Sequence, residues 1–422
     1  MTTSHATSRP AIPARPPLAS HWTHDASIVF LNHGSFGGCP REVLAAQDAI
    51  RARMEAEPVR FFVEELQGLM DETRDAVAGF VDCDWDDLAF LPNATTGVAI
   101  ALENIGLKPG DEILANDHEY PACLNNARRI AERAGAKVVV AKLPWPLPLD
   151  RGEESVIDAI LAGASPRTRV ALISHVTSPS GLVLPIDKLV AALKARGILT
   201  LIDGAHAPGM VEGLSLRNLD PDFYTANCHK WVCSPKGSAL LYVRKALQKN
   251  FRPLVLSNNA ELPKAVRSQF LTEFDYIGTS DYSAILAIPA ALKSMSDMLR
   301  GGGGFSAVMR HNRDLTLRAR RLITDAIGST PVAPESMIGS IASIFLPPRG
   351  DGAPASSRPP TSRYGDSLQE RLIDQWHIQV PVWGVPGTPQ RVLRISAQLY
   401  NCFEQYEYLL HALRHELKAE HH

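Results

Sequence analysis

The chain has 422 residues, of which 45% are hydrophobic and 21% charged, and its formal net charge is −2. This length allows two domains with a sizeable core, and the absence of a basic run argues against a nucleic-acid partner. No apolar stretch approaches the ~20 residues that span a bilayer, so we expect no membrane segment. The six scattered cysteines form no C-x-x-C pair, which favours a reducing, cytoplasmic compartment and predicts no metal centre.

Residues 1–28 are predicted to form a disordered tail. The first twenty, MTTSHATSRPAIPARPPLAS, contain Arg9 and Arg15 and no acidic residue, as a transit peptide could. Their prolines interrupt any amphipathic helix, and they contain no apolar core for a secretory signal. A disordered tail is therefore favoured over a targeting peptide.

Short apolar runs alternate with helical patterns between residues 88 and 244. Near-continuous apolar strands separated by helices are typical of a parallel sheet that is covered on both faces. Such sheets bind ligands at the carboxyl ends of their strands. The predicted strands are LAFL (88–91), EILA (112–115), KVVVAKL (137–143), RVALISHV (169–176) and ILTLIDGAHA (198–207), with DFYTANCHK and SALLYVR after them.

The remainder of the chain predicts a second, smaller domain. The glycines of 301–304 indicate a flexible turn where the chain leaves the large domain, so we place the domains at 29–300 and 301–422. Residues 347–363 are rich in proline, glycine and serine and predict a mobile loop within the second domain. A late strand at RVLRIS (391–396) and a closing helix at 403–417 follow.

Two motifs place an acid and a lysine directly after apolar strands. In LIDGAHAPG (201–209) Asp203 follows a strand, although a helix cap or a turn would explain a single aspartate as well. In ANCHKWVCSPKG (226–237) Lys230 lies between His229 and Trp231. A buried lysine has a lowered pKa and becomes a nucleophile toward aldehydes, whereas the alternative is a surface lysine with a partly buried stem.

A third motif, PNATTG (92–97), joins a strand to the start of a helix. Backbone N–H groups and two threonine hydroxyls at a helix N-terminus form an anion site, although Thr95 or Thr96 could simply cap the helix. Pyridoxal 5′-phosphate (PLP) requires a lysine for its aldehyde, an acid for its pyridine nitrogen and a cradle for its phosphate. All three occur at strand ends, and together they predict a PLP site.

With these motifs the chain resembles the class V PLP enzymes, which include cysteine desulfurases and isopenicillin N epimerase. The resemblance extends from Val29 to the last helix and is strongest to isopenicillin N epimerase-like proteins. It implies an α/β fold, the PLP-dependent transferase fold type I, with a mainly parallel seven-stranded sheet in the large domain and a smaller α+β C-terminal domain. The motifs of that branch are LNHGSFG (31–37), DHEYPA (117–122), SHVTSPSGLVLP (174–185) and IDGAHAPG (202–209).

The resemblance also implies roles for single residues around the cofactor. Lys230 would bond to the aldehyde, Asp203 would pair with the pyridine nitrogen and His206 with the phenolic oxygen. Tyr120 matches the position that stacks on the ring, and His118 is the weaker candidate. The residues implied for the phosphate are Ala94 through its N–H, Thr95, Thr96 and His229, with Thr279 reaching the site of a second subunit.

For the substrate, Arg394 matches the arginine that binds the carboxylate, and a planar guanidinium suits its two oxygens. Asn32 and His33 come from the segment that borders this pocket. Arg391 is predicted to be an unimportant surface arginine. The stretch PVWGVPGTPQRVLR (381–394) lacks the cysteine of cysteine desulfurases, which argues against persulfide chemistry, and Cys402 is predicted to be a buried structural thiol.

The resemblance thus implies an enzyme acting on the α-carbon of an amino acid or a derivative, assembled as a homodimer with shared active sites. Lys230 would remove the α-proton, and Tyr120 or a pocket histidine could return one from the opposite face. Epimerisation is the favoured outcome; a C–S lyase on a cysteine-derived thioether or sulfoxide, or an aminotransferase, is the alternative. A non-catalytic sensor is disfavoured because the lysine and the acid are both present.

Overall fold

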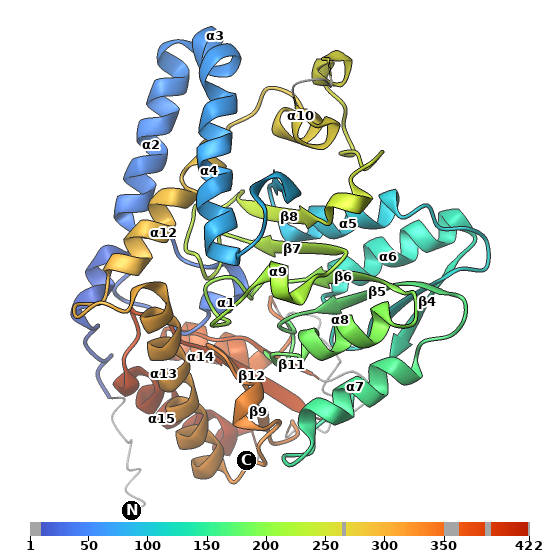
Figure 1. Cartoon of the computed structure of the whole chain (residues 1–422). Helices are drawn as coiled ribbons and strands as arrows, with labels where there is room; N and C mark the ends of the chain where they lie inside the picture. Colours follow the sequence, from blue (N-terminus) through green and yellow to red (C-terminus); the bar gives the residue numbers. More distant parts are fainter. Residues whose placement is uncertain (1–9, 264–266, 350–362, 385–389, 421–422) are drawn as a thin grey trace, which may run out of the picture.

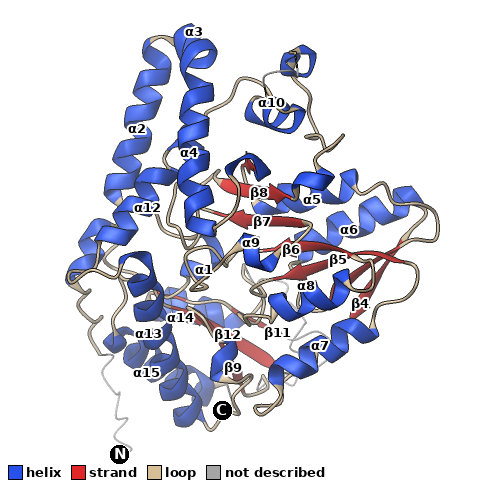
Figure 2. Ribbon diagram, viewed as in Figure 1, coloured by secondary structure: helices blue, strands red, loops and turns tan. Residues whose placement is uncertain are grey.

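The computed structural model describes residues 10–263, 267–349, 363–384 and 390–420. Figure 1 shows a central sheet with helices on both sides and a second, smaller sheet next to the C-terminal helices. In Figure 2 a long pair of helices extends beyond one end of the central sheet. The candidate site lies where several strands of the central sheet end.

The central sheet has seven strands in the order β2-β8-β7-β6-β5-β3-β4. β8 is antiparallel to both of its neighbours, and the other neighbouring strands run parallel. The predicted mainly parallel seven-stranded sheet and the α/β fold are thereby confirmed. The strands are β2 (Leu88–Leu91), β3 (Glu112–Asn116), β4 (Lys137–Ala141), β5 (Thr168–Ser174), β6 (Leu199–Asp203), β7 (Phe223–Asn227) and β8 (Ala239–Val243).

Both faces of this sheet are buried except at the edge strand β4, which explains why the inner strands are apolar without alternation. Along β6, Leu201 belongs to one core cluster and Ile202 to the other, so successive side chains enter opposite layers. An acid at the end of β6 therefore emerges from a rigid support. The connecting helices are α5 (Ala94–Asn104), α6 (Pro121–Ala134), α7 (Gly152–Ala162), α8 (Ile186–Lys194) and α9 (Leu216–Leu219).

A helical hairpin packs beside the sheet (Figure 2). Arg74 on its second long helix is fully buried and pairs with Asp275 and Asp71, which fastens the hairpin to α10. The hairpin consists of α2 (Arg41–Ala56), α3 (Pro58–Arg60), η2 (Phe61–Glu65) and α4 (Leu66–Val81). The elements around it are η3 (Trp85–Asp87), η4 (Lys245–Leu247), η5 (Asn258–Glu261), α10 (Gln269–Asp275), α11 (Ser283–Leu286) and α12 (Ile288–Asp297).

The C-terminal part contains a three-stranded antiparallel sheet in the order β11-β12-β9. The predicted strand 391–396 is β12, and the predicted closing helix is α15. The elements are α13 (Gly304–Ile327), η6 (Glu335–Met337), β9 (Ile341–Leu346), α14 (Ser367–Trp376), β10 (Ile378–Gln379), β11 (Val382–Gly384), β12 (Arg391–Ser396) and α15 (Phe403–Ala419). Most of the predicted loop, residues 350–362, lies outside the described residues. The division into two domains at residue 300 stays a prediction.

The segment before the sheet is more ordered than we expected. β1 (Val29–Phe30) pairs in parallel with β10, which ties the N-terminal segment to the C-terminal part. Within the expected tail, η1 (Pro17–His21) is followed by Trp22, whose side chain is 1% exposed and donates to the Gly38 carbonyl at 3.2 Å. Disorder was therefore the wrong prediction for this stretch, because a buried tryptophan anchors it; residues 1–9 lie outside the described residues. Among the described helices, none is long and apolar enough to cross a membrane.

Candidate active site

A cavity of about 160 Å³ opens where β2, β5, β6 and β7 end. Seven of the nine predicted cofactor residues line it, and Thr96 and Thr279 do not. The sheet thus brings together side chains that are up to 136 positions apart in the sequence, as expected for the carboxyl edge of a parallel sheet. The seven residues are Ala94, Thr95, Tyr120, Asp203, His206, His229 and Lys230.

Lys230 follows β7 and projects into this cavity. Its Nζ lies 3.1 Å from Nε2 of His206, and burial lowers the pKa of Lys230 to about 8 although Asp203 opposes that shift. Burial and the charge of Lys230 also lower the pKa of His206 well below its usual value, so its ring is neutral. A partly neutral, enclosed amine is the form that attacks an aldehyde.

The motif 31–37 packs behind this lysine. Gly37 has φ +69°, and a Cβ there would lie 2.1 Å from the His229 carbonyl oxygen, so no other residue fits. His33 is fully buried, and burial lowers its pKa to about 3. Its neutral ring donates from Nε2 to the Lys230 carbonyl at 3.0 Å and accepts at Nδ1 from the Tyr400 hydroxyl at 2.8 Å. His33 thus supports the lysine backbone and is not among the residues that line the cavity.

Asp203 ends β6 on the cavity wall. Its Oδ1 accepts from the Ala205 N–H at 2.9 Å, and its Oδ2 accepts from the Cys123 thiol at 3.2 Å. Burial raises the pKa of Asp203, whereas these two hydrogen bonds and the charge of Lys230 favour the ionised form. A cationic pyridine nitrogen would favour it further.

Glu119 lies beside Asp203 and was not among the predicted site residues. The ligand atoms of Glu119, Cys123 and Asp203 all lie within 4.8 Å of one another, a spacing that a metal ion could use. Burial raises the pKa of Cys123 far above its usual value, and the thiol proton is donated to Asp203. We therefore interpret the three groups as a hydrogen-bonded cluster, because a thiol that keeps its proton is a poor metal ligand.

The helix N-terminus of α5 also lines the cavity. Asn93 caps the helix by accepting from the N–H of Thr96 at 2.9 Å and from its hydroxyl at 3.0 Å. The N–H of Ala94 donates to Oδ1 of Asn227 at 2.8 Å. Asn93 and Asn227 were missed. Asn93 lies between a strand and a helix, which is a cap signal that the sequence contained, whereas Asn227 ends β7 and gives no such signal. A phosphate at Ala94 would have to replace Asn227 as the acceptor.

His229 occupies the same wall. Its Nδ1 donates to the Ser238 carbonyl at 3.0 Å, and burial lowers its pKa to about 4, so the ring is neutral. With the proton on Nδ1, Nε2 of the neutral ring can only accept a hydrogen bond. It can therefore contact a phosphate if the phosphate carries a proton, or if the ring itself becomes protonated. The predicted contact of His229 with phosphate stays a prediction.

Arg394 lies on β12, behind the cavity wall. Nη2 donates to the Ser35 hydroxyl at 2.9 Å and approaches Asn32 Oδ1 at 3.5 Å, and Nη1 donates to the Ser178 carbonyl. Ser35 and Ser178 both line the cavity, and burial lowers the pKa of Arg394 to about 10. Among the described residues, its acceptors are neutral and no carboxylate pairs with it. The guanidinium can therefore receive a carboxylate from outside the chain.

Two other predictions about this region were wrong. Arg391, expected on the surface, is 0% exposed and pairs with Glu420 at 2.6 Å and with Asp366 at 3.4 Å. Cys402, expected to be buried, is partly exposed and caps the start of α15. Arg391 is buried because Glu420, just after the C-terminal helix, returns to β12, a contact that the local sequence does not encode.

Thr279 is exposed and bonds to the Tyr276 hydroxyl at 2.9 Å, away from the cavity of its own chain.

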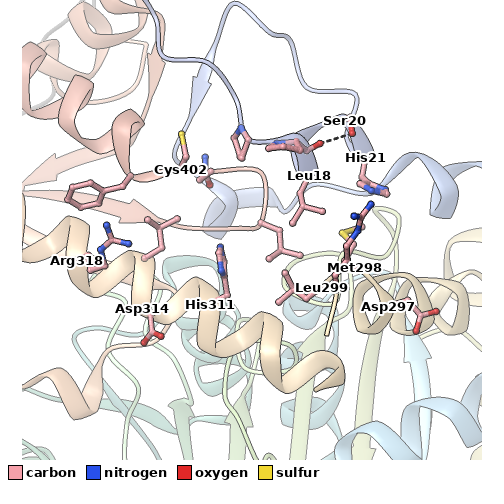
Figure 3. A pocket seen from close by; sticks show the side chains of 17 residues that line it. Leu18, Ser20, His21, Asp297, Met298, Leu299, His311, Asp314, Arg318 and Cys402 are labelled. Atoms are coloured by element: carbon pink, nitrogen blue, oxygen red, sulfur yellow. Dashed lines mark hydrogen bonds between the residues drawn. The ribbon is translucent and has the colours of Figure 1, made fainter. Parts of the chain in front are cut away.

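A second hollow, of about 1070 Å³, lies between η1, α13 and the start of α15 (Figure 3). In Figure 3, Leu18 and His21 from the N-terminal segment lie across from His311 of α13. None of the predicted cofactor residues lines this hollow, and we assign no chemistry to it.

The residues around Lys230 fit PLP. The lysine amine is enclosed, Asp203 offers a carboxylate to a ring nitrogen, and the buried Nδ1 of His206 has no partner among the described residues. An enclosed lysine, a carboxylate and a helix N-terminus at one sheet edge define a PLP-binding protein. The profile of the class V aminotransferases matches residues 31–346, so the chain belongs to this family, and PLP is its cofactor.

Comparison with characterised proteins gives two groups of relatives. Isopenicillin N epimerase from Streptomyces clavuligerus is 33% identical over 401 residues, covering 92% of this chain and 95% of the relative. A probable chloroplastic L-cysteine desulfhydrase from Arabidopsis thaliana is 28% identical, and the match covers 92% of this chain and 83% of the relative. The cystine C-S lyase C-DES, solved with cysteine persulfide, has a TM-score of 0.74 at 21% identity, covering 92% and 97% of the two chains, which confirms the fold.

Proposed function

We propose that this chain is an isopenicillin N epimerase-like enzyme that epimerises an amino-acid-derived substrate at its α-carbon. The observation that carries the proposal is the 33% identity to the Streptomyces epimerase, against 28% to the desulfhydrase over the same share of this chain. The cavity supports chemistry at an α-carbon because an enclosed amine and a carboxylate line one space, and the Arg394 guanidinium contacts Ser35 on the wall of that space.

PLP supplies an aldehyde that bonds to the substrate amine and a ring that withdraws electrons from the α-carbon. Arg394 binds the substrate carboxylate with two parallel N–H groups and thereby orients the α-carbon toward Lys230. Neutral Nζ of Lys230 takes the α-proton, and neutral His206 at 3.1 Å keeps that amine in place. Tyr120, which lines the cavity and is 43% exposed, is the proposed donor that returns a proton from the other face.

The phosphate would lie at the N-terminus of α5, on Ala94, Thr95 and Thr96, with His229 beside it. Of the two threonines, Thr96 already donates its hydroxyl to the capping Asn93, whereas Thr95 lines the cavity and has no such contact to give up. A helix N-terminus favours an anion through its free N–H groups and its dipole.

We further propose a homodimer in which Thr279 reaches the phosphate of the partner subunit. Support comes from exposed apolar side chains in the same region, because a soluble monomer rarely leaves them uncovered. They are Leu254, Val255, Leu256 and Ile277. Sedimentation of the purified holoenzyme tests the assembly; a monomer that is fully active at nanomolar concentration would contradict it.

The six cysteines are free of disulfides, which supports a reducing, cytoplasmic compartment.

A C–S lyase is the second candidate, favoured by the L-cysteine desulfhydrase relatives. The first proton transfer to Lys230 would be the same, but the substrate would then lose a sulfur group from its β-carbon. The cavity does not require a protein cysteine for this outcome, since the sulfur leaves with the substrate. Substrate choice therefore separates the two candidates.

The test is incubation of the holoenzyme in D₂O with a panel of amino acids, including cysteine thioethers and sulfoxides. Epimerisation predicts deuterium at Cα together with the inverted stereoisomer. Release of pyruvate or a sulfur product without inversion would favour the lyase, and accumulated pyridoxamine phosphate an aminotransferase. If no substrate exchanges its α-proton, the enzymatic proposal is wrong and the sensor is favoured. Lys230→Ala is the control and should show none of these signals.

A further inference from the structure

Glu119 is a buried carboxyl group that the proposed reaction does not use. It is 2% exposed, follows β3, and lies within 4.8 Å of both Cys123 and Asp203. Its Oε1 accepts from the Ser174 hydroxyl at 2.7 Å and from the Tyr120 N–H at 2.7 Å. Its Oε2 is buried and has no partner among the described residues. The two oxygens thus have different environments, as in a carboxylic acid with one carbonyl and one hydroxyl oxygen.

No lysine or arginine of the described residues forms an ion pair with Glu119. The ionisable groups around the pair are Cys123 on α6, Tyr224 on β7 and Lys230, and the charge of Lys230 acts on Asp203. Two carboxylates at this distance in a buried site repel each other, so one of them keeps a proton. Burial and the charge of Asp203 raise the pKa of Glu119 to about 8.

Which of the two carboxyls is charged follows from their donors. Asp203 accepts from the Ala205 N–H and the Cys123 thiol, one on each oxygen, and it lies on the cavity wall near Lys230. Glu119 receives both of its hydrogen bonds on the same oxygen and is not among the residues that line the cavity. The charge is therefore better stabilised on Asp203.

We propose that Glu119 is a positioning residue that holds the single proton of a carboxyl pair, so that the negative charge stays on Asp203, where a cationic pyridine nitrogen needs it. The inference rests on the proposed role of Asp203 toward PLP. It assigns to the DHEYPA motif a function separate from the ring contact of Tyr120. Ser174 has a supporting role, because its hydroxyl orients the carbonyl oxygen of the neutral acid.

A matched control is present at the other end of the same segment, in β3. Glu112 at the start of β3 is also 2% exposed, but Arg167 Nε lies 2.9 Å from its Oε1 and Ser165 Oγ lies 2.6 Å from its Oε2. These hydrogen bonds lower the pKa of Glu112 to about 2. Two buried glutamates, one at the start of β3 and one just after its end, are thus expected in opposite protonation states at neutral pH.

The experiment is infrared difference spectroscopy of the holoenzyme with ¹³C-carboxyl glutamate, combined with ¹⁵N NMR of PLP labelled at the pyridine nitrogen. At pH 7 a carboxylic acid band should be present in the wild type and in Glu112→Gln and be lost in Glu119→Gln. Raising the pH should remove it with a midpoint near 8. The ring nitrogen should remain protonated in Glu119→Gln, whose amide resembles the neutral acid, and lose its proton in Asp203→Asn.

A wild type without this band at pH 7, or a deprotonated ring nitrogen in Glu119→Gln, would overturn the proposal. If Glu119→Gln fails to fold, the labelled wild type decides alone, because the pH dependence of its band needs no variant. Failure of the proposed PLP site gives a different result. In that case the wild type shows no visible absorption from bound PLP, whereas the carboxyl band is still measurable on the protein itself.

Discussion

Two buried arginines on β12 have opposite surroundings. Arg391 forms ion pairs with Glu420 and Asp366, so carboxylates of the same chain compensate its charge. Arg394, three residues later, contacts a serine hydroxyl, a backbone carbonyl and an asparagine, none of which carries a charge. One arginine therefore completes the fold, and the other is left with an unbalanced charge beside the cavity.

Whether a buried arginine has a carboxylate partner within the chain thus distinguishes a structural arginine from one that can bind a ligand. Burying an arginine is costly unless its charge is compensated. A chain that keeps such a charge uncompensated next to a cavity loses stability, and an anionic ligand restores the balance. The aromatic ring of Trp383, 4.9 Å from the Arg394 guanidinium, offsets part of this cost.

The largest effect is expected from Arg391→Met. Removing one partner of a buried ion pair costs about 3–5 kcal/mol of the free energy of unfolding, because Glu420 and Asp366 lose their cation. Urea denaturation of the variant and the wild type measures this loss. A change below about 1 kcal/mol would show that the pair contributes little and that the contrast between the two arginines is wrong.

Arg394→Ala should act on substrate rather than on folding. Loss of a desolvated partner for the substrate carboxylate costs about 2–5 kcal/mol, which raises KM by about 30-fold to several thousand-fold. PLP content and the urea midpoint should stay near those of the wild type. Steady-state kinetics with the substrate found in the D₂O panel provides the measurement. An unchanged KM would remove Arg394 from the substrate site.

The pH dependence of cofactor attachment sharpens the same contrast. The pKa of Lys230 is lowered from 10.5 to about 8, chiefly by burial and further by the charge of Arg394. The reactive neutral amine therefore increases as the pH rises through about 8, and so should the rate of PLP uptake by the cofactor-free protein. Arg394→Ala should move this midpoint upward, and Arg391→Met should leave it in place. An identical midpoint in Arg394→Ala would mean that its charge does not reach the lysine.

The smallest effect is expected from Ser35→Ala. This change removes the neutral acceptor at 2.9 Å from Arg394 Nη2 and leaves the arginine free to meet a carboxylate. A hydrogen bond to a charged group contributes about 1.5–3 kcal/mol, part of which the substrate regains. We expect KM to change less than tenfold, in contrast to Arg394→Ala. A loss as large as that of Arg394→Ala would show that Ser35 binds the substrate itself.

Much of the site could be predicted because its residues follow apolar strands. Asp203 ends β6 and Lys230 comes soon after β7, so strand periodicity alone places both at one sheet edge. The chain fold decides the rest. The partners of Arg391 lie 25 and 29 residues away, and Glu119 becomes informative only when β3 and β6 bring it beside Asp203. Trp22 was misjudged because proline-rich flanks indicate disorder, whereas a single buried ring orders them.

Arg394 is expected to bind the carboxylate of an amino acid at the PLP site of Lys230. This expectation is tested most directly by titrating the visible absorption of bound PLP with alanine and with ethylamine, which lacks only the carboxylate. The wild type and Arg391→Lys should bind alanine at least about 30-fold more tightly than ethylamine, as expected for a desolvated charge pair. In Arg394→Ala this preference should fall nearly to one. An undiminished preference for alanine in Arg394→Ala would contradict the account.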